Sequence, residues 1–228
     1  VDMSGTLQEY DRSTNVATGT IRAAVNGSLV GGTGSVTGGV WTLSNVTAFD
    51  GDVVTAWVDG ALDDSDKAVS VFVYDGLGDI TGVELFEQHL SVSADEANSI
   101  SNGLMGSYDN SVSGDSDIFF DVDAFGNLTV CDTGSCDDAN LYIGPNNTFV
   151  ASSTDAVSVT AHDLVNDGTI SFDDDTVNLT GSWDNNATST SGGLTLNMIA
   201  STTDEIISDV NDPLVFENIS FGSGSGTS

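Results

Sequence analysis

Closely spaced aspartates carry the side chains with the clearest potential for chemistry. Asp115 and Asp117 are separated by one residue, and Asp121 and Asp123 follow shortly after them. Carboxylate oxygens are the ligands that Ca²⁺ prefers, so these four residues are candidate ligands of a calcium ion. The segment does not match an EF-hand loop, because Phe125 stands where such a loop needs Asp or Asn. The alternative is a hydrated acidic surface suited to high salt or to solubility.

Few other residues have a type and spacing that support catalysis. Glu84 and Glu87 form a carboxylate pair in a strand-like segment, as glycoside hydrolysis needs, but nothing in the sequence indicates a substrate cleft. No Gly-x-Ser-x-Gly turn joins a strand to a helix, as serine hydrolysis on an α/β fold would require. No Lys or Arg follows Lys67, so the later part of the chain has no cationic base or clamp. We therefore expect a protein without enzymatic activity.

The charge of the chain excludes several classes of partner. The 228 residues contain 35 Asp and Glu against 3 Lys and Arg, which gives a formal net charge of -32. Such a field repels the phosphates of nucleic acids and the headgroups of anionic lipids. The sequence also has no apolar run of about 18 residues, so we expect no insertion into a membrane.

The two cysteines, Cys131 and Cys136, bracket a short turn that follows a strand-like segment. A disulfide clasp is the favoured interpretation, and it indicates an oxidising, extracellular compartment. Free thiols and a metal-binding pair remain as alternatives. His89 and His162 are too distant in sequence to suggest the remaining ligands of a zinc site.

Asn-x-Ser/Thr motifs occur somewhat more often than chance would give. They predict glycan attachment on a secreted or cell-surface protein, although Asn is also simply a good turn residue. The candidate acceptors are Asn26, Asn45, Asn127, Asn146, Asn178, Asn186 and Asn218.

The pattern of hydrophobic residues predicts an all-β protein in three parts. Residues 1–75 show alternating strands separated by Gly, Asn and Asp turns such as Asn26-Gly27, which is typical of an antiparallel β-sandwich. Residues 76–146 contain additional strands and the cysteine clasp. The strands expected in these two parts cover residues 4–10, 19–25, 40–45, 52–58, 68–74, 82–86, 117–122, 127–131 and 140–143.

Residues 147–228 follow a different pattern. Apolar triplets such as Val157–Val159 and Val177–Leu179 recur about every 20 residues, and the similar corners at Asn166-Asp167-Gly168 and Asn185-Asn186-Ala187 lie 19 residues apart. A period of this length predicts the stacked rungs of a short β-solenoid. The Gly- and Ser-rich residues that follow Phe221 have the composition of a linker.

The N-terminal motifs resemble a known type of module. Ser4-Gly-Thr-Leu, Thr20-Ile-Arg-Ala-Ala-Val-Asn-Gly-Ser, Gly39-Val-Trp-Thr-Leu and the segment 51–60 are similar to Ig-like modules of very large secreted surface proteins of bacteria and archaea. In that resemblance the modules are followed by Asn-Leu-Thr-Val, here residues 127–130, and by rungs with Asn-x-Gly-Thr, here residues 166–169. It implies an Ig-like sandwich, a solenoid, and adhesin, stalk or fibre material without catalytic residues.

These observations predict an extracellular structural subunit that assembles through strand edges into a surface fibre, pilus-like filament, stalk or layer. Its partners would be copies of itself or neighbouring modules of a longer chain, and the expected joints are Met3–Tyr10 and Pro213–Phe221. The alternative is an adhesin or carbohydrate-binding module that uses Trp57, Trp183 and Tyr108 as exposed aromatic residues.

Overall fold

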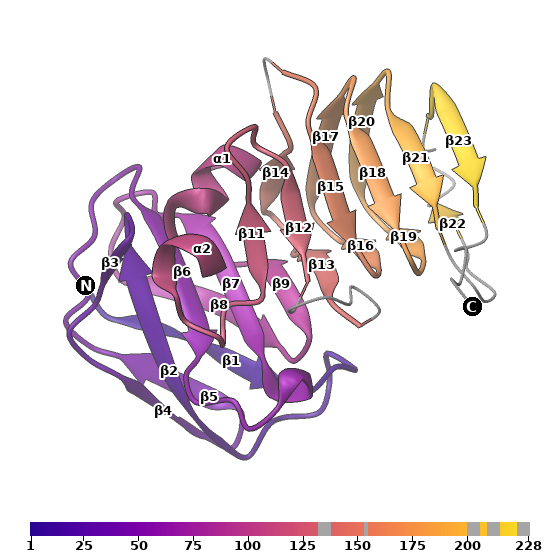
Figure 1. Ribbon diagram of the computed structural model, residues 1–228. Helices are drawn as coiled ribbons and strands as arrows, with labels where there is room; N and C mark the ends of the chain where they lie inside the picture. The colour runs from indigo at the N-terminus through magenta and orange to yellow at the C-terminus, as the bar shows by residue number, and fades with distance from the viewer. Residues whose placement is uncertain (132–137, 153–154, 200–205, 209–214, 223–228) are drawn as a thin grey trace.

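The computed structural model is nearly all β, which confirms the predicted fold class (Figure 1). It describes residues 1–131, 138–152, 155–199, 206–208 and 215–222. The strands form a 13-stranded, a 4-stranded and a 6-stranded sheet, called here the long sheet, the short sheet and the front sheet. Helix in the described residues is confined to single turns, which are η1 (Asp64–Asp66), α1 (Asn102–Met105), η2 (Gly106–Tyr108) and α2 (Asn110–Ser113).

The N-terminal part of the long sheet curls around a core of its own. Its strands are β1 (Met3–Gln8), β2 (Thr18–Val25), β3 (Ser28–Leu29), β4 (Gly34–Thr37), β5 (Val40–Leu43), β6 (Val53–Val58), β7 (Ala68–Val73), β8 (Ile80–Phe86) and β9 (His89–Val92). Most neighbours are antiparallel, in the order β7-β6-β2-β4-β5-β1, and β8 then pairs with β1 in parallel. Met3, Ile21, Trp41 and Leu85 meet in the enclosed core.

Local turn chemistry explains the hairpin between β2 and β3. Asn26 and Gly27 both have positive φ, at 47° and 77°. This geometry fits a two-residue hairpin turn, for which Asn-Gly is the preferred pair. The Asn26 carboxamide also accepts a hydrogen bond from the Val53 amide and donates one to Asp52. The predicted turn is confirmed. The bond from the Val53 amide also holds β6, the neighbour of β2 in the long sheet, against this turn.

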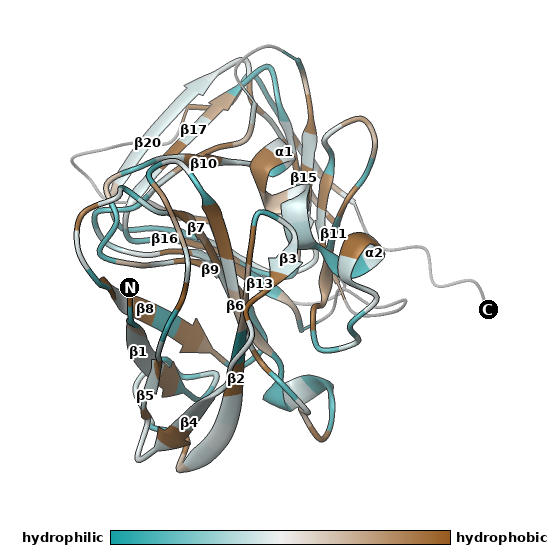
Figure 2. Ribbon diagram, turned by 90° about the vertical axis from the view of Figure 1, so that its left-hand side faces the viewer, coloured by the Kyte–Doolittle hydropathy of each residue, from teal (hydrophilic) through white to brown (hydrophobic). Residues whose placement is uncertain are grey.

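Strands β6, β7 and β9 form a wall that is buried on both faces. Every residue of these three strands is buried. On one face, Val54 and Phe72 belong to the N-terminal core, whereas Trp57 and Val71 on the other face belong to the core of the solenoid. Figure 2 shows the hydrophobic character of β6 in brown, in contrast to the pale, polar β20 (Thr188–Gly192). The two cores are therefore layered on opposite sides of one sheet.

The solenoid is built from three sheets, whose neighbouring strands in this part of the chain are parallel except for the antiparallel pair β11–β12. The long sheet continues from β9 through β13 (Asn140–Ile143), β16 (Leu164–Asn166), β19 (Trp183–Asn185) and β22 (Ile206–Ser208). The short sheet contains β10 (Ile100–Ser101), β14 (Thr148–Val150), β17 (Thr169–Asp173) and β20. The front sheet contains β11 (Phe120–Val122), β12 (Leu128–Val130), β15 (Ser158–Ala161), β18 (Thr176–Leu179), β21 (Thr195–Met198) and β23 (Asn218–Phe221).

The rungs repeat at the predicted spacing. Val159, Val177, Leu196 and Ile219 are in register in successive strands of the front sheet, at intervals of 18, 19 and 23 residues. Alternate residues of β15, β18 and β21 are buried, so each strand sends one row of side chains into the interior. The β-solenoid prediction is confirmed for the described residues.

The two asparagine corners stack as predicted. Asn166 pairs in register with Asn185, and both side chains are fully buried. The Asn166 Nδ2 donates to Asn185 Oδ1 at 2.7 Å and to the Thr188 carbonyl at 3.0 Å, and its Oδ1 accepts from the Gly168 amide. These bonds satisfy the buried amide and carbonyl groups at the corner, where the backbone bends away from the strands and cannot pair with a neighbouring strand.

The Ig-like character of residues 1–75 stays a prediction, as does the division at residues 75 and 146. The strands β8 and β9, which follow residue 75, complete the N-terminal sheet by pairing with β1 and β7. The solenoid rungs are in place from β12 onward, through the pairing of β12 with β15 and of β13 with β16.

Candidate functional site

Among the described residues, three strands near the C-terminal end of the solenoid are each the last strand of their sheet. Within the described part of the chain, β20 pairs only with β17, β22 only with β19, and β23 only with β21. We call these three strands the open end. Figure 1 shows it at the far end of the molecule from the N-terminal strands. Unpaired strand edges present amide and carbonyl groups that another strand can bind.

Apolar side chains gather around this open end. The described residues from β21 onward include several large hydrophobic side chains that are exposed to solvent. Phe221 is the most exposed of them, at 74%. The others are Ile199, Ile207, Val215 and Ile219. Exposed apolar groups beside unpaired strands are a common mark of an interaction surface.

A column of aromatic rings connects the open end to the interior. Phe149, Phe172, Trp183 and Phe216 follow one another with ring centroids 6.2, 5.8 and 5.6 Å apart, each pair in an edge-to-face arrangement. The first three rings are buried, whereas Phe216 is only partly buried. The solenoid core therefore extends to the open end and is incompletely covered there.

At the opposite end of the solenoid, the long sheet continues into the N-terminal part, whereas β10 and β11 are the terminal strands of the other two sheets. The long sheet continues without interruption from β13 through β9 into β7. In the front sheet, the antiparallel strand β11 ends the parallel series, and the buried Asp109 carboxylate accepts from the Val122 amide of that strand at 2.9 Å. In the short sheet, β10 leads directly into α1, which Ser101 caps through the Leu104 amide.

The predicted joint at Met3–Tyr10 is wrong. Strand β1 lies inside the sheet, paired with β5 on one side and with β8 on the other, and its side chains Met3 and Leu7 are buried. A strand with two partners offers no edge. The second predicted joint falls partly on residues 213 and 214, which lie outside the described residues, but its strand β23 is at the open end.

The aromatic residues of the carbohydrate-binding alternative are not exposed. Trp57 and Trp183 are 0% exposed and Tyr108 is 5% exposed, and all three belong to the solenoid core. Trp57 and Tyr108 contact each other with ring centroids 5.3 Å apart. Their assignment as a sugar-stacking surface is therefore wrong, because the large apolar rings gain more from burial than a solvent-facing position would allow.

The four candidate calcium ligands accept hydrogen bonds from main-chain amides in the structure. Asp117 accepts from the Gly60 amide, Asp115 from the Asp117 amide, and Asp121 from the Ser111 amide, and Asp123 accepts from the loop that ends at Asn127. Among the described residues, no group of three or more His, Cys, Asp or Glu is arranged to hold a metal ion. Calcium binding stays a prediction.

The sequence-predicted modification sites differ in their surroundings. Asn26, Asn45, Asn146, Asn186 and Asn218 are exposed, and Asn127 and Asn178 are half-buried with hydrogen-bonded carboxamides. Glycosylation stays a prediction at all of them. Cys131 follows β12 and is half-buried, but its expected partner Cys136 lies outside the described residues, so the disulfide clasp is also still a prediction.

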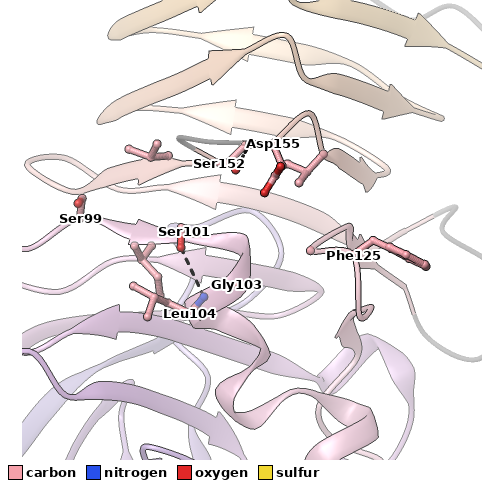
Figure 3. A pocket seen from close by; sticks show the side chains of 12 residues that line it. Ser99, Ser101, Gly103, Leu104, Phe125, Ser152 and Asp155 are labelled. Atoms are coloured by element: carbon pink, nitrogen blue, oxygen red, sulfur yellow. Dashed lines mark hydrogen bonds between the residues drawn. The ribbon is translucent and has the colours of Figure 1, made fainter.

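A separate pocket of about 510 Å³ lies between α1, the turn at Phe125 and the loop after β14 (Figure 3). Its lining combines hydroxyl groups, apolar side chains and the carboxylate of Asp155. The Ser101 hydroxyl is occupied as a helix cap and the Ser152 hydroxyl accepts from the Asp155 amide. A single carboxylate cannot supply the pair that glycoside hydrolysis needs. The pocket therefore supports no particular reaction.

The half-buried Glu87 and the buried Glu96 make stability depend on pH. Burial, reinforced by the nearby Asp66, raises the pKa of Glu87 to about 7, and burial together with the nearby Asp75 and Asp95 raises the pKa of Glu96 to about 7. Burial lowers the pKa of His89 from 6.5 to about 4. His89 therefore changes the stability of the fold mainly between pH 4 and 6.5, where the unfolded chain binds a proton that the folded chain does not.

We expect the melting temperature to fall as the pH rises from 6.5 to 8. In this range the folded glutamates lose protons that the unfolded chain has already lost, so folding becomes less favourable. After solvent screening the expected loss is about 1 kcal/mol, or about 2–4 °C. Calorimetry across this pH range measures it. The double variant Glu87→Gln, Glu96→Gln should show a flatter profile, and an equally steep one would contradict the assignment.

The fold and the open end are the features of this chain that bear on its class. In the described part of the chain, no helix has the length and apolar character needed to cross a membrane. Comparison of the chain with protein-family models, with curated proteins and with solved structures gives no match. The fold and the chemistry of the chain itself are therefore the basis for assigning a function.

Proposed function

We propose that this chain is a non-enzymatic structural subunit of an extracellular assembly, such as a surface fibre, pilus-like filament, stalk or layer. Its partners are copies of itself or neighbouring modules of a longer chain. The open end is the observation that carries the proposal, because the terminal strands of three sheets, as described, and an incompletely covered core meet there. Unpaired strands bind further strands through main-chain hydrogen bonds.

Other features support the same function. The net charge of -32 is compatible with a protein that stays soluble until it is assembled. The Ig-like interpretation of residues 1–75, the cysteine clasp and the glycosylation motifs belong to this extracellular proposal. Calcium bound near Asp115, Asp117, Asp121 and Asp123 would reduce repulsion between carboxylates.

Electron microscopy of the purified chain tests the function. We expect regular fibres or layers, and we expect calcium to promote them because it neutralises part of the negative charge. The same sample should be imaged with calcium and after chelation. Loss of the assemblies on chelation would place the acidic clusters at or near a contact.

Dispersed monomers under both conditions would contradict the assembly function. The chain would then be better explained as an adhesin or carbohydrate-binding module, and a glycan array would test that alternative. An assembly subunit should show no selective binding to sugars on the array.

A further inference from the structure

We propose that a polar pocket between the N-terminal part and the solenoid binds an arginine or lysine side chain of a basic peptide from another protein. The pocket has a volume of about 490 Å³ and lies against β1, β5, β8 and the connections that follow β9 and β13. Figure 2 shows β5, β1 and β8 side by side. The inference goes beyond the proposed assembly of copies, because it concerns a partner of a different kind.

Two carboxylates of this pocket each keep one oxygen for a ligand. Glu84 Oε2 accepts from the Ser93 hydroxyl at 2.6 Å, and Asp95 Oδ2 accepts from the Thr81 hydroxyl at 3.1 Å. The second oxygen of each carboxylate accepts no hydrogen bond from the described residues. Among the described residues that line the pocket, none is Lys, Arg or His. The lining therefore carries negative charge and no cation that would neutralise it.

Three hydroxyl groups add to these acceptors. Ser4 and Thr42 are register partners in β1 and β5, and Thr6 is the register partner of Glu84 in β8. All four residues line the pocket. The three hydroxyls have no hydrogen-bond partner in the described part of the chain. A hydroxyl oxygen can accept as well as donate, so the pocket suits a cationic group with several N–H donors.

A buried donor also lines the pocket. Trp41 is 3% exposed, and its indole Nε1 has no hydrogen-bond partner among the described residues. Trp57 and Trp183 have the same unpartnered atom but belong to the solenoid core. A buried N–H group without a partner is costly, so an acceptor from outside the chain is favoured at Trp41. A basic peptide supplies both kinds of group, since its carbonyls accept and its charged side chain donates.

The walls of the pocket are fixed by contacts within the chain. The buried Asn147 donates to the Pro145 carbonyl at 3.0 Å and accepts from the Ala94 amide at 3.3 Å, which ties the connection after β13 to the one after β9. Gly82 has φ of 65°, and a Cβ there would lie 2.5 Å from the carboxyl carbon of Asp95. A side chain at position 82 would therefore displace this carboxylate. Groups that are held in place lose little freedom when a ligand binds.

The charge of the chain favours a partner other than a second copy. Each of its three Lys and Arg residues already lies beside a carboxylate. The pairs are Arg12–Asp167 at 3.4 Å, Arg22–Asp59 at 3.9 Å and Lys67–Asp64 at 2.9 Å. A second copy would also bring a further charge of -32 to the contact. A basic peptide is attracted by the same field, and a guanidinium group matches the geometry of a carboxylate.

Fluorescence anisotropy of a labelled Gly-Arg-Gly-Arg-Gly peptide tests the inference, at about 0.15 M salt so that distant charges are screened. We expect saturable binding to the full chain. The peptide Gly-Gln-Gly-Gln-Gly should bind more than about tenfold more weakly, because it cannot form charge-assisted hydrogen bonds. In amide NMR spectra, the signals of Gly82, Asp95 and Asn147 should shift when the arginine peptide is added. Equal binding of the two peptides, or shifts confined to other residues, would overturn the inference.

A matched pair of variants separates the pocket from the net charge. The double variant Glu84→Gln, Asp95→Asn should weaken binding of the arginine peptide by about tenfold, because two partly exposed charge-assisted hydrogen bonds are lost. The control Asp184→Asn, Glu217→Gln removes the same charge outside the pocket and should change the affinity by less than about twofold. Equal weakening by both would show attraction by net charge alone and would refute the pocket. Circular dichroism and thermal melting establish that both variants are folded.

The outcomes separate this inference from the proposed function. Binding of the arginine peptide by a chain that forms no fibres or layers would leave the pocket standing and remove the assembly function. Fibres of a chain that binds the arginine and glutamine peptides equally would leave the assembly function standing and overturn the pocket.

Discussion

Replacing Trp183 by alanine is expected to destabilise the protein by about 3–5 kcal/mol, the usual cost of removing a large buried aromatic residue. Trp183 is fully buried and contacts Phe172 and Phe216 in the aromatic column. Among the described residues its indole Nε1 has no hydrogen-bond partner, so the expected loss comes from packing. The hydrogen-bonded strands on every side of the solenoid limit the collapse of the resulting cavity.

Chemical denaturation of the purified variant measures this loss. Trp183→Phe keeps a ring in the column and should cost clearly less than Trp183→Ala. Leu62→Ala provides the matched surface control, because Leu62 is 92% exposed and its truncation should change stability by less than about 0.5 kcal/mol. A loss below about 1 kcal/mol for Trp183→Ala would show that the column does not support the solenoid.

The substitution Asn166→Asp is expected to be the second most damaging change. It keeps the shape of the side chain but removes the Nδ2 donor to Asn185 Oδ1 and to the Thr188 carbonyl. It also places a carboxylate in a position that is 0% exposed. Loss of a buried partner costs about 1–3 kcal/mol, and a charge without a counterion adds to it.

The pH dependence of this variant identifies the mechanism. Because burial without a counterion raises the pKa of a carboxyl group, the loss should shrink as the pH falls from 7 to 4 and the new carboxyl is protonated. Asn146→Asp is the control, since Asn146 is exposed and lies in a turn with φ of 65°. Urea unfolding at several pH values distinguishes the two variants. Equal effects at both positions would contradict the importance of the stacked corner.

Local sequence patterns were sufficient for part of this fold. The alternation in β2 and the Asn26-Gly27 turn depend on a few neighbouring residues, so these features could be predicted. The corner at Asn166 could be predicted because its counterpart at Asn185 follows at the repeat distance of the rungs.

Features that depend on distant pairing could not be predicted in this way. Strand β9 is buried on both faces and so shows no alternation, and β20 is polar on both faces. The position of β1 between β5 and β8 depends on residues up to 78 positions apart, such as Leu7 and Leu85. The exposure predicted for Trp183 was wrong for the same reason, because its neighbours come from other rungs.

The open end was only partly predictable. Residues near β23 were expected to form a joint, but the sequence did not distinguish that strand from β1 as an edge. Which strand is an edge depends on the order of all strands in the sheet, and this order is a property of the whole fold. The signal that separates them in the structure is burial, since Met3 is fully buried and Phe221 is exposed.

The wall of β6, β7 and β9 also has a mechanical consequence. Strand β9 pairs with β7 of the N-terminal part and with β13 of the solenoid, so no slack segment separates the two. Tension along the solenoid axis passes from strand to strand, and the hydrogen bonds of each rung share the load. Under such a load the protein would respond as one stiff rod, which yields when a rung separates, and not as two beads joined by an extensible thread.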